Sequence, residues 1–118
     1  MTKLLFTAPL LVLLAAAPAH ATGGLLCKTA GPRPVELALG FGHVSGSPLI
    51  LTRLRDNGRQ VPVKSAQYWL DSSELRLLLI DPTAAREELV VRARRSGFVY
   101  DGALWRSGKR RWVRCRES

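Results

Sequence analysis

One stretch near the C-terminus decides the fold: Tyr100-Asp101-Gly102-Ala103-Leu104-Trp105-Arg106-Ser107-Gly108-Lys109-Arg110-Arg111-Trp112-Val113-Arg114-Cys115. Two turn signals, Asp101-Gly102 and Ser107-Gly108, divide it into short segments that carry two tryptophans and a cysteine. Dipeptides of this kind supply the positive φ angles that tight hairpin turns require. The stretch therefore predicts a basic antiparallel β-meander that ends in a disulfide-bonded cysteine.

The hairpin pattern extends toward the N-terminus. Residues 25–28 can start a first strand, and apolar side chains alternate with others over 35–41 and again over 49–55. Asn57-Gly58 then gives a strong hairpin signal. The return strand over 60–66 contains Pro62, which cannot donate a hydrogen bond to a neighbouring strand. We therefore expect this strand to lie at a sheet edge or to carry a bulge.

The segment 74–80 is apolar on both faces in its second half and predicts the most buried strand. Residues 81–88 begin Asp-Pro and contain alanines and acids, which favours one helical turn. A strand through Arg95 follows, because Val91 and Ala93 alternate with arginines. The sum is about seven or eight short strands, typical of a small single-domain antiparallel β-barrel or sandwich.

The first residues have the pattern of an export signal. Met1-Thr2-Lys3 is a short positive region, residues 4–18 are apolar, and Ala19-His20-Ala21 is a small-x-small cleavage site. The apolar run is shorter than the roughly 20 residues of a membrane-spanning helix. We therefore expect a cleaved signal peptide over 1–21, a disulfide-stapled β domain over 22–118, and a periplasmic or secreted location.

The two cysteines, Cys27 and Cys115, lie near opposite ends of the expected domain. Disulfides form and persist in exported proteins, so we expect the two residues to be bonded to each other. Two cysteines and the single histidine that follows the signal make a poor zinc site. The sequence therefore predicts one disulfide, no metal site and no cofactor.

The positive charge is regional. The chain has 18 Lys and Arg residues against 9 Asp and Glu residues, a formal net charge of +9. Beyond Lys3, the excess lies between Arg92 and Arg116, where nine basic residues accompany Asp101 alone. The rest of the expected domain is neutral, so the basic character belongs to the C-terminal meander and not to a uniform surface coat.

The basic meander is the best candidate for a binding surface. Guanidinium groups bind phosphate and carboxylate in a bidentate way and stack on aromatic rings. We therefore expect a non-enzymatic domain that binds an anionic polymer or envelope macromolecule. A structural reading stays open, in which the tryptophans are core residues and the arginines only solvate the sheet. The anion-binding candidates are Arg92, Arg94, Arg95, Arg106, Lys109, Arg110, Arg111 and Arg114, and the aromatic contact candidates are Tyr100, Trp105 and Trp112.

An enzymatic function has little support in the sequence. His43 has serines nearby but no pattern that ties a nucleophile to a base and an orienting group. The carboxylates are scattered, mostly at turns, where aspartate favours local hydrogen bonds. Gly40, Gly42 and Gly46 lack the Lys-Ser/Thr of a phosphate-binding loop. We therefore expect no catalytic residue.

A second functional reading comes from a resemblance. Ser96-Gly97-Phe98-Val99-Tyr100, followed by Trp105-Arg106-Ser107-Gly108 and the terminal Cys115, resembles the exported inhibitors of c-type lysozyme. That resemblance implies a disulfide-bonded β-barrel in which Ser96 and Tyr100 belong to a loop that enters the lysozyme cleft. Phe98 stands where that family has a small residue, and a basic face suits a basic lysozyme poorly. A purely structural or interaction protein is the remaining alternative.

Overall fold

The computed structural model describes residues 23–42 and 49–118. Nine strands and no helix are present in these two ranges. The expected signal peptide over 1–21 and the candidate His43 lie outside them. The strands are β1 (Gly24–Thr29), β2 (Val35–Phe41), β3 (Leu49–Asp56), β4 (Arg59–Val61), β5 (Lys64–Leu70), β6 (Glu74–Ile80), β7 (Glu87–Ser96), β8 (Val99–Arg106) and β9 (Lys109–Glu117).

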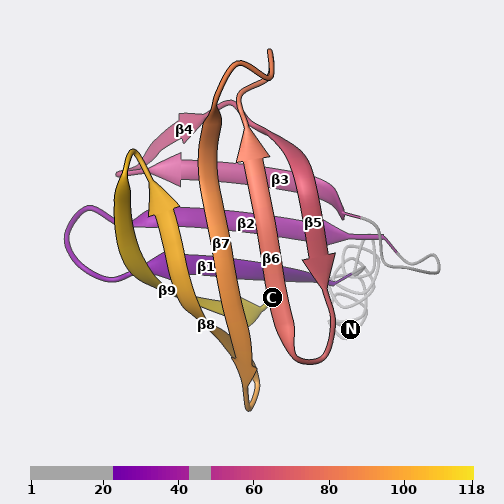
Figure 1. Ribbon diagram of the computed structural model, residues 1–118. Helices are drawn as coiled ribbons and strands as arrows, with labels where there is room; N and C mark the ends of the chain where they lie inside the picture. The colour runs from indigo at the N-terminus through magenta and orange to yellow at the C-terminus, as the bar shows by residue number, and fades with distance from the viewer. Residues whose placement is uncertain (1–22, 43–48) are drawn as a thin grey trace, which may run out of the picture.

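The strands form one antiparallel sheet in the order β4-β3-β2-β1-β9-β8-β7-β6-β5. Strands that follow one another in the chain are hydrogen-bonded neighbours, except β4 and β5, which are the two edges. β1 and β9 pair in the middle of the sheet and so join the two ends of the described chain. The sheet curls into a half-barrel, in which β6 and β7 cross in front of β1–β3 (Figure 1).

The core lies between the two halves of the curled sheet. Alternate residues of each strand point inward, as in β2, where Val35, Leu37, Leu39 and Phe41 are all buried. The opposite half contributes inward-facing side chains from β6 to β9 to the same hydrophobic cluster. Phe41 stacks on Tyr68 of edge strand β5, with ring centroids 5.7 Å apart. The core thus consists of aliphatic and a few aromatic side chains, and none of the three tryptophans belongs to it.

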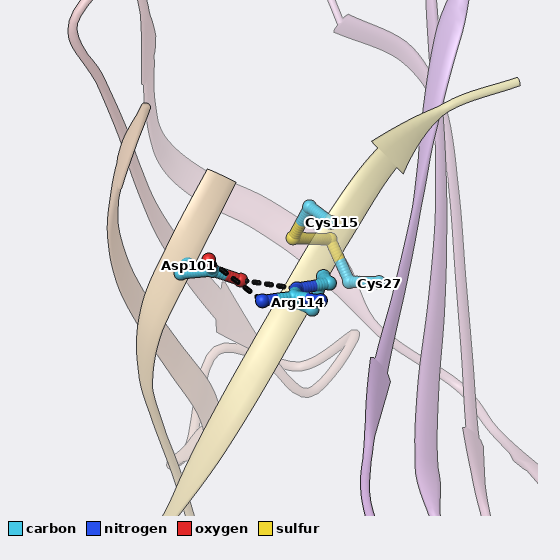
Figure 2. The surroundings of a disulfide bond; sticks show 4 residues. All are labelled: Cys27, Asp101, Arg114 and Cys115. Carbon is cyan, nitrogen blue, oxygen red and sulfur yellow. Dashed lines mark hydrogen bonds and ion pairs between the residues drawn. A yellow bond between two sulfur atoms is a disulfide. The ribbon is translucent and has the colours of Figure 1, made fainter. Parts of the chain in front are cut away.

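The predicted disulfide is confirmed. Cys27 and Cys115 are direct cross-strand partners on β1 and β9, their Cα atoms are 3.9 Å apart, and both side chains are buried. Figure 2 shows the bond between the first and last strands, beside the ion pair of Asp101 and Arg114. The covalent link closes a loop with a sequence separation of 88.

The all-β antiparallel prediction is confirmed in outline, and the nine strands slightly exceed the seven or eight expected. The expected strand over 60–66 is broken after Val61 at Pro62, so β4 and β5 are separate strands at opposite edges of one sheet. Pro62 itself lies in neither strand, and the two strands that flank it, β4 and β5, are the edges of the sheet. One curled sheet of nine strands takes the place of two packed sheets.

Two local predictions are wrong. Asp101-Gly102 is not a turn: it lies inside β8, and the β7–β8 hairpin turns at Gly97 and Phe98. The expected helical turn over 82–88 is a hairpin loop, because Ala84 adopts a left-handed φ of 61° and the backbone N–H of Asp81 donates to the carbonyl oxygen of Arg86 across the loop. Asn57-Gly58 and Ser107-Gly108 are hairpin turns, as predicted, and all four residues have positive φ.

Across the ranges that the structure describes, there is no helix long and apolar enough to cross a membrane.

Candidate functional site

The solvent side of β5–β9 carries a row of side chains that cross-strand pairing places in one line. Trp69 of β5 is opposite Arg76 of β6, and Arg76 is opposite Arg92 of β7. Arg92 is opposite Ala103 of β8, which is opposite Trp112 of β9. Each of these positions alternates with inward-facing neighbours, so all five point away from the core. We call this row, together with the adjacent Trp105 and Arg110, the outer β5–β9 face.

All three tryptophans of the chain lie on this face. Trp69 and Trp112 are 55% and 60% exposed. Trp105 is partly covered, with the guanidinium carbon of Arg110 5.9 Å from its ring centroid. The sequence left open whether Trp105 and Trp112 are core or surface residues, and the structure places both on the surface. An indole held away from the core can stack on a ligand.

Three adjoining hollows mark the outer β5–β9 face, and Arg92 lines all of them. The first lies beside Trp105 and the β8–β9 turn, and the second lies between Trp69 and Arg92. The third has the small residues Gly102 and Ala103 among its lining, together with Trp105 and Trp112. Small residues between larger neighbours leave space above the sheet. Arg92 lies at the border shared by the three hollows.

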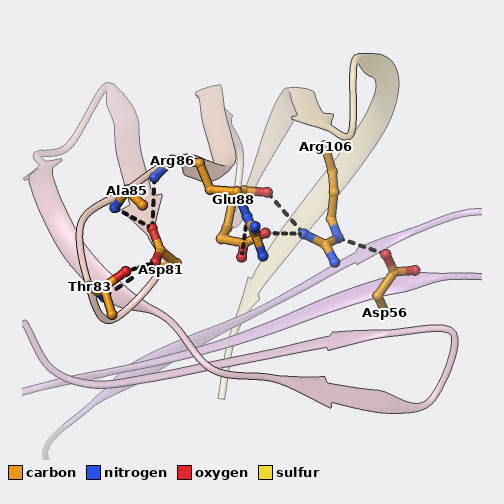
Figure 3. A network of polar contacts seen from close by, with 7 residues as sticks. All are labelled: Asp56, Asp81, Thr83, Ala85, Arg86, Glu88 and Arg106. Carbon is orange, nitrogen blue, oxygen red and sulfur yellow. Dashed lines mark hydrogen bonds and ion pairs between the residues drawn. The ribbon is translucent and has the colours of Figure 1, made fainter.

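Two of the predicted anion-binding arginines lie elsewhere, because they occupy inward-facing positions at one open end of the half-barrel. Arg106 donates from Nε to Asp56 Oδ2 at 2.6 Å and from Nη1 to Glu88 Oε1 at 3.1 Å, as Figure 3 shows. Its side chain is only 13% exposed. Arg111 donates to the backbone carbonyl oxygens of Ala30 and Arg33 in the β1–β2 loop. Both guanidinium groups therefore have structural partners within the chain.

The remaining predicted cations differ in how far their charge is compensated. Arg114 forms a bidentate pair with Asp101. Within the residues that the structure describes, Arg92, Arg94, Arg95 and Arg110 form no ion pair, and Arg95 donates to the neutral carbonyl oxygen of Gly97. Lys109 is exposed at the β8–β9 turn. The four arginines without an ion pair all line the third hollow, so the uncompensated positive charge gathers there.

Tyr100 is a core residue. It is 6% exposed, and its hydroxyl donates to the backbone carbonyl oxygen of Asp71 at 2.8 Å. Its ring therefore joins the β8 strand to the β5–β6 turn. In the lysozyme-inhibitor resemblance Tyr100 would belong to the inserting loop, but its ring faces the core. Ser96, Gly97 and Phe98 are exposed at the tip of that hairpin, and the Phe98 side chain is 86% exposed.

Sequence reasoning missed Trp69 and Arg76. Trp69 Nε1 donates to Asp71 Oδ2 at 2.9 Å, while Arg76 pairs with Glu74 at 2.8 Å. The backbone N–H of Ser73, then its hydroxyl, then the indole of Trp69 hold the pKa of Asp71 well below its usual range. The signal was the alternation of Tyr68, Trp69 and Leu70, which places the indole on the opposite side from its two core neighbours.

Metal or cofactor binding has no positive support in the described ranges, where no group of three or more His, Cys, Asp or Glu side chains could hold a metal ion.

Comparison with protein-family models, with curated proteins and with solved structures gives no match.

Proposed function

We propose that this protein is an exported, non-enzymatic domain that binds an anionic polymer on the outer β5–β9 face. The position of Arg92 carries the proposal: an arginine without an ion pair among the described residues stands where three hollows meet. Arg94 and Arg110 lie beside it, and Trp105 and Trp112 flank the same surface. Guanidinium groups offer paired donors to carboxylate or phosphate, and the indoles add stacking area.

The export part of the proposal has its own support. A disulfide persists in oxidising compartments and is rare in the reducing cytosol. The bond between Cys27 and Cys115 agrees with the predicted signal peptide over 1–21. In the compartments outside the inner membrane, an anionic polymer is a component of the cell envelope or of its surroundings.

Binding to polyphosphate and to polygalacturonate at a series of NaCl concentrations tests the proposal. Affinity for at least one polymer should fall as the NaCl concentration rises, because each arginine or lysine side chain that contacts the polymer displaces counterions from it. Replacing Arg92 and Arg110 together by Gln should weaken binding by at least about tenfold, since each charge-assisted hydrogen bond contributes about 1.5–3 kcal/mol.

The matched control is the double replacement Arg53→Gln and Arg55→Gln. These exposed arginines lie on the outer side of β3, in the other half of the sheet, so the change in net charge is the same. The proposal predicts an unchanged affinity for the control. Equal losses for the two double variants, or no salt-dependent binding to either polymer, would overturn it.

A further inference from the structure

Trp69 is exposed and yet held in one orientation. Its ring nitrogen donates to Asp71 Oδ2 at 2.9 Å. The other carboxylate oxygen of Asp71 accepts the backbone N–H of Ser73 at 2.8 Å and that of Glu74 at 2.9 Å. The carboxylate is thus fixed by the β5–β6 turn, and the indole is fixed by the carboxylate. A pre-ordered side chain loses little conformational freedom when a ligand stacks on it.

Trp69 lies at one end of the cross-strand row, and Trp112 lies at the other. Arg76 and Arg92 lie between them, on β6 and β7. Neighbouring strands are about 4.8 Å apart, so four spacings separate the two tryptophans by roughly 19 Å along the sheet. A polymer that lies across the strands would meet an aromatic ring at each end and guanidinium groups between them. The hollows on either side of Arg92 follow the same line.

Charge on this surface is sparse and mixed. Glu74 pairs with Arg76, Asp101 pairs with Arg114, and Glu87 and Glu88 line the hollow beside Trp105, so carboxylates lie among the arginines. A backbone with a phosphate at every unit would bring charges close to these carboxylates as well as to the arginines. A chain of sugar rings with one carboxylate per ring carries less charge per length than inorganic polyphosphate does, and it offers C–H faces. Those faces bear partial positive charge and suit the negative face of an indole.

We propose that the ligand of the outer β5–β9 face is an acidic polysaccharide lying across β5–β9, with Trp69 and Trp112 as stacking contacts at the two ends and Arg92 as the central carboxylate contact. This inference rests on the proposed function and narrows its ligand. Nucleic-acid bases also stack on tryptophan. The disulfide favours the polysaccharide, because disulfides persist in oxidising compartments whereas nucleic acid is concentrated in the cytosol.

The test compares three probes: an oligogalacturonate with one carboxylate per ring, a polyphosphate chain with charge but no rings, and a single-stranded oligodeoxynucleotide. Trp69→Ala should weaken oligogalacturonate binding about tenfold and leave polyphosphate affinity within about twofold. Of these two probes, only the oligogalacturonate has rings that can stack on the indole. Trp69→Phe keeps a stacking face and should fall between wild type and Trp69→Ala. Trp112→Ala should repeat the selective loss at the other end of the row.

The control is Phe98→Ala, which removes an exposed aromatic at the β7–β8 tip and should leave all affinities unchanged. Equal oligogalacturonate affinities of wild type and Trp69→Ala would overturn the inference. If Arg92→Gln still weakened polyphosphate binding in that case, the proposed binding of an anionic polymer would hold and only the polysaccharide inference would be rejected. Tighter binding of the oligodeoxynucleotide, with the same sensitivity to Trp69→Ala, would identify nucleic acid and reject the polysaccharide. Absence of binding to all three probes would reject both proposals.

Discussion

Asp71 and Asp81 hold the turns at the two ends of β6. Asp71 accepts hydrogen bonds from Trp69, Ser73 and Glu74. Asp81 accepts the backbone N–H groups of Ala85 and Arg86 at 2.7 Å and the hydroxyl of Thr83 (Figure 3). Each carboxylate accepts backbone N–H groups that the turn would otherwise leave hydrogen-bonded to water. At the residue scale, these two side chains set where β6 begins and ends.

The pH dependence of stability should report these two carboxylates. The hydroxyl of Thr83 and the backbone N–H of Arg86 lower the pKa of Asp81 to about 2, and the turn hydrogen bonds lower that of Asp71 further. A carboxyl with a depressed folded pKa stabilises the fold above its unfolded pKa of about 3.9, and this contribution is lost as pH falls below that value. We expect the urea midpoint to drop steadily between about pH 4 and pH 2.

Asp71→Asn and Asp81→Asn should each lower the urea midpoint at pH 7 and flatten its decline in acid. Glu87→Gln is the control, since Glu87 is exposed and forms no ion pair within the described ranges. If the urea midpoint of the double variant Asp71→Asn, Asp81→Asn fell in acid as far as that of the wild type, other groups would cause the decline.

At the scale of elements, Gly102 of β8 lies so close to β7 that there is no room for a side chain. A Cβ atom at Gly102 would lie 2.1 Å from the carbonyl oxygen of Arg92 and 2.6 Å from the Cα atom of Ala93. Both contacts are to backbone, so the strands would have to separate. Glycine at this point lets the sheet curl tightly beneath the outer β5–β9 face.

Gly102→Ala should therefore destabilise the protein by about 2 kcal/mol or more, the scale of overpacking in a tight site. Gly40→Ala in β2 is the matched control, because the three atoms nearest to its Cβ would all belong to the Leu51 side chain, the first at 3.1 Å. Chemical denaturation measures both. Equal stabilities of the two variants would contradict the close approach of β7 and β8.

The ion-pair network of Arg106 joins β8 to β3 and β7 at one end of the half-barrel. Arg106→Met removes the cation of Asp56 and leaves Glu88, whose side chain is 11% exposed, with the exposed Arg86 as its remaining ion-pair partner. We expect a loss of about 2–3 kcal/mol, because breaking a mostly buried ion pair costs far more than breaking an exposed one. Arg116→Met, at an exposed position of β9, should change stability by less than about 0.5 kcal/mol. Similar small losses in both variants would show that the network adds nothing to stability.

Sequence patterns predicted most strands but misplaced one turn. The alternation over 35–41 coincides with β2, because alternation records directly which side chains are buried, and the apolar run over 74–80 coincides with β6. Asp101-Gly102 has the same turn composition as Asn57-Gly58 and still lies inside a strand. Its place is set by long-range pairing, since Gly102 packs against Ala93 and Asp101 pairs with Arg114. Local composition does not contain that information.

At the scale of the whole molecule, the disulfide joins strands at the two ends of the described chain. On the chain-entropy account, a loop of this length stabilises the fold by about 4–5 kcal/mol. Reduction, or replacement of Cys27 and Cys115 by Ala, should lower the free energy of unfolding by an amount of that order. Intact mass should rise by two hydrogens on reduction. A stability unchanged by reduction would show that the paired β1 and β9 strands hold the ends together without the bond.

The location of the candidate surface was predictable from the sequence, but the residues that form it were not. The charge excess after Arg92 pointed to β7–β9, where Arg92, Arg94 and Arg110 lie. Strand alternation then divides the arginines between two faces, so Arg106 and Arg111 serve the fold. Trp69 comes from a neutral segment, and alternation turns its indole outward, but it shares a face with Arg92 and Trp112 because of the strand order from β5 to β9. Strand order, which the sequence does not state, decides which residues meet.

The central claim is that the outer β5–β9 face binds an acidic polysaccharide. Titration of the ¹⁵N-labelled protein with an oligogalacturonate tests it most directly, since the three indole N–H signals report three points of one surface. We predict saturable shifts of the Trp69, Trp105 and Trp112 indoles and of the β6–β9 amides around Arg92, with the β2–β3 amides unchanged. Shifts confined to β1–β3, or unmoved indole signals at saturating ligand, would contradict the claim.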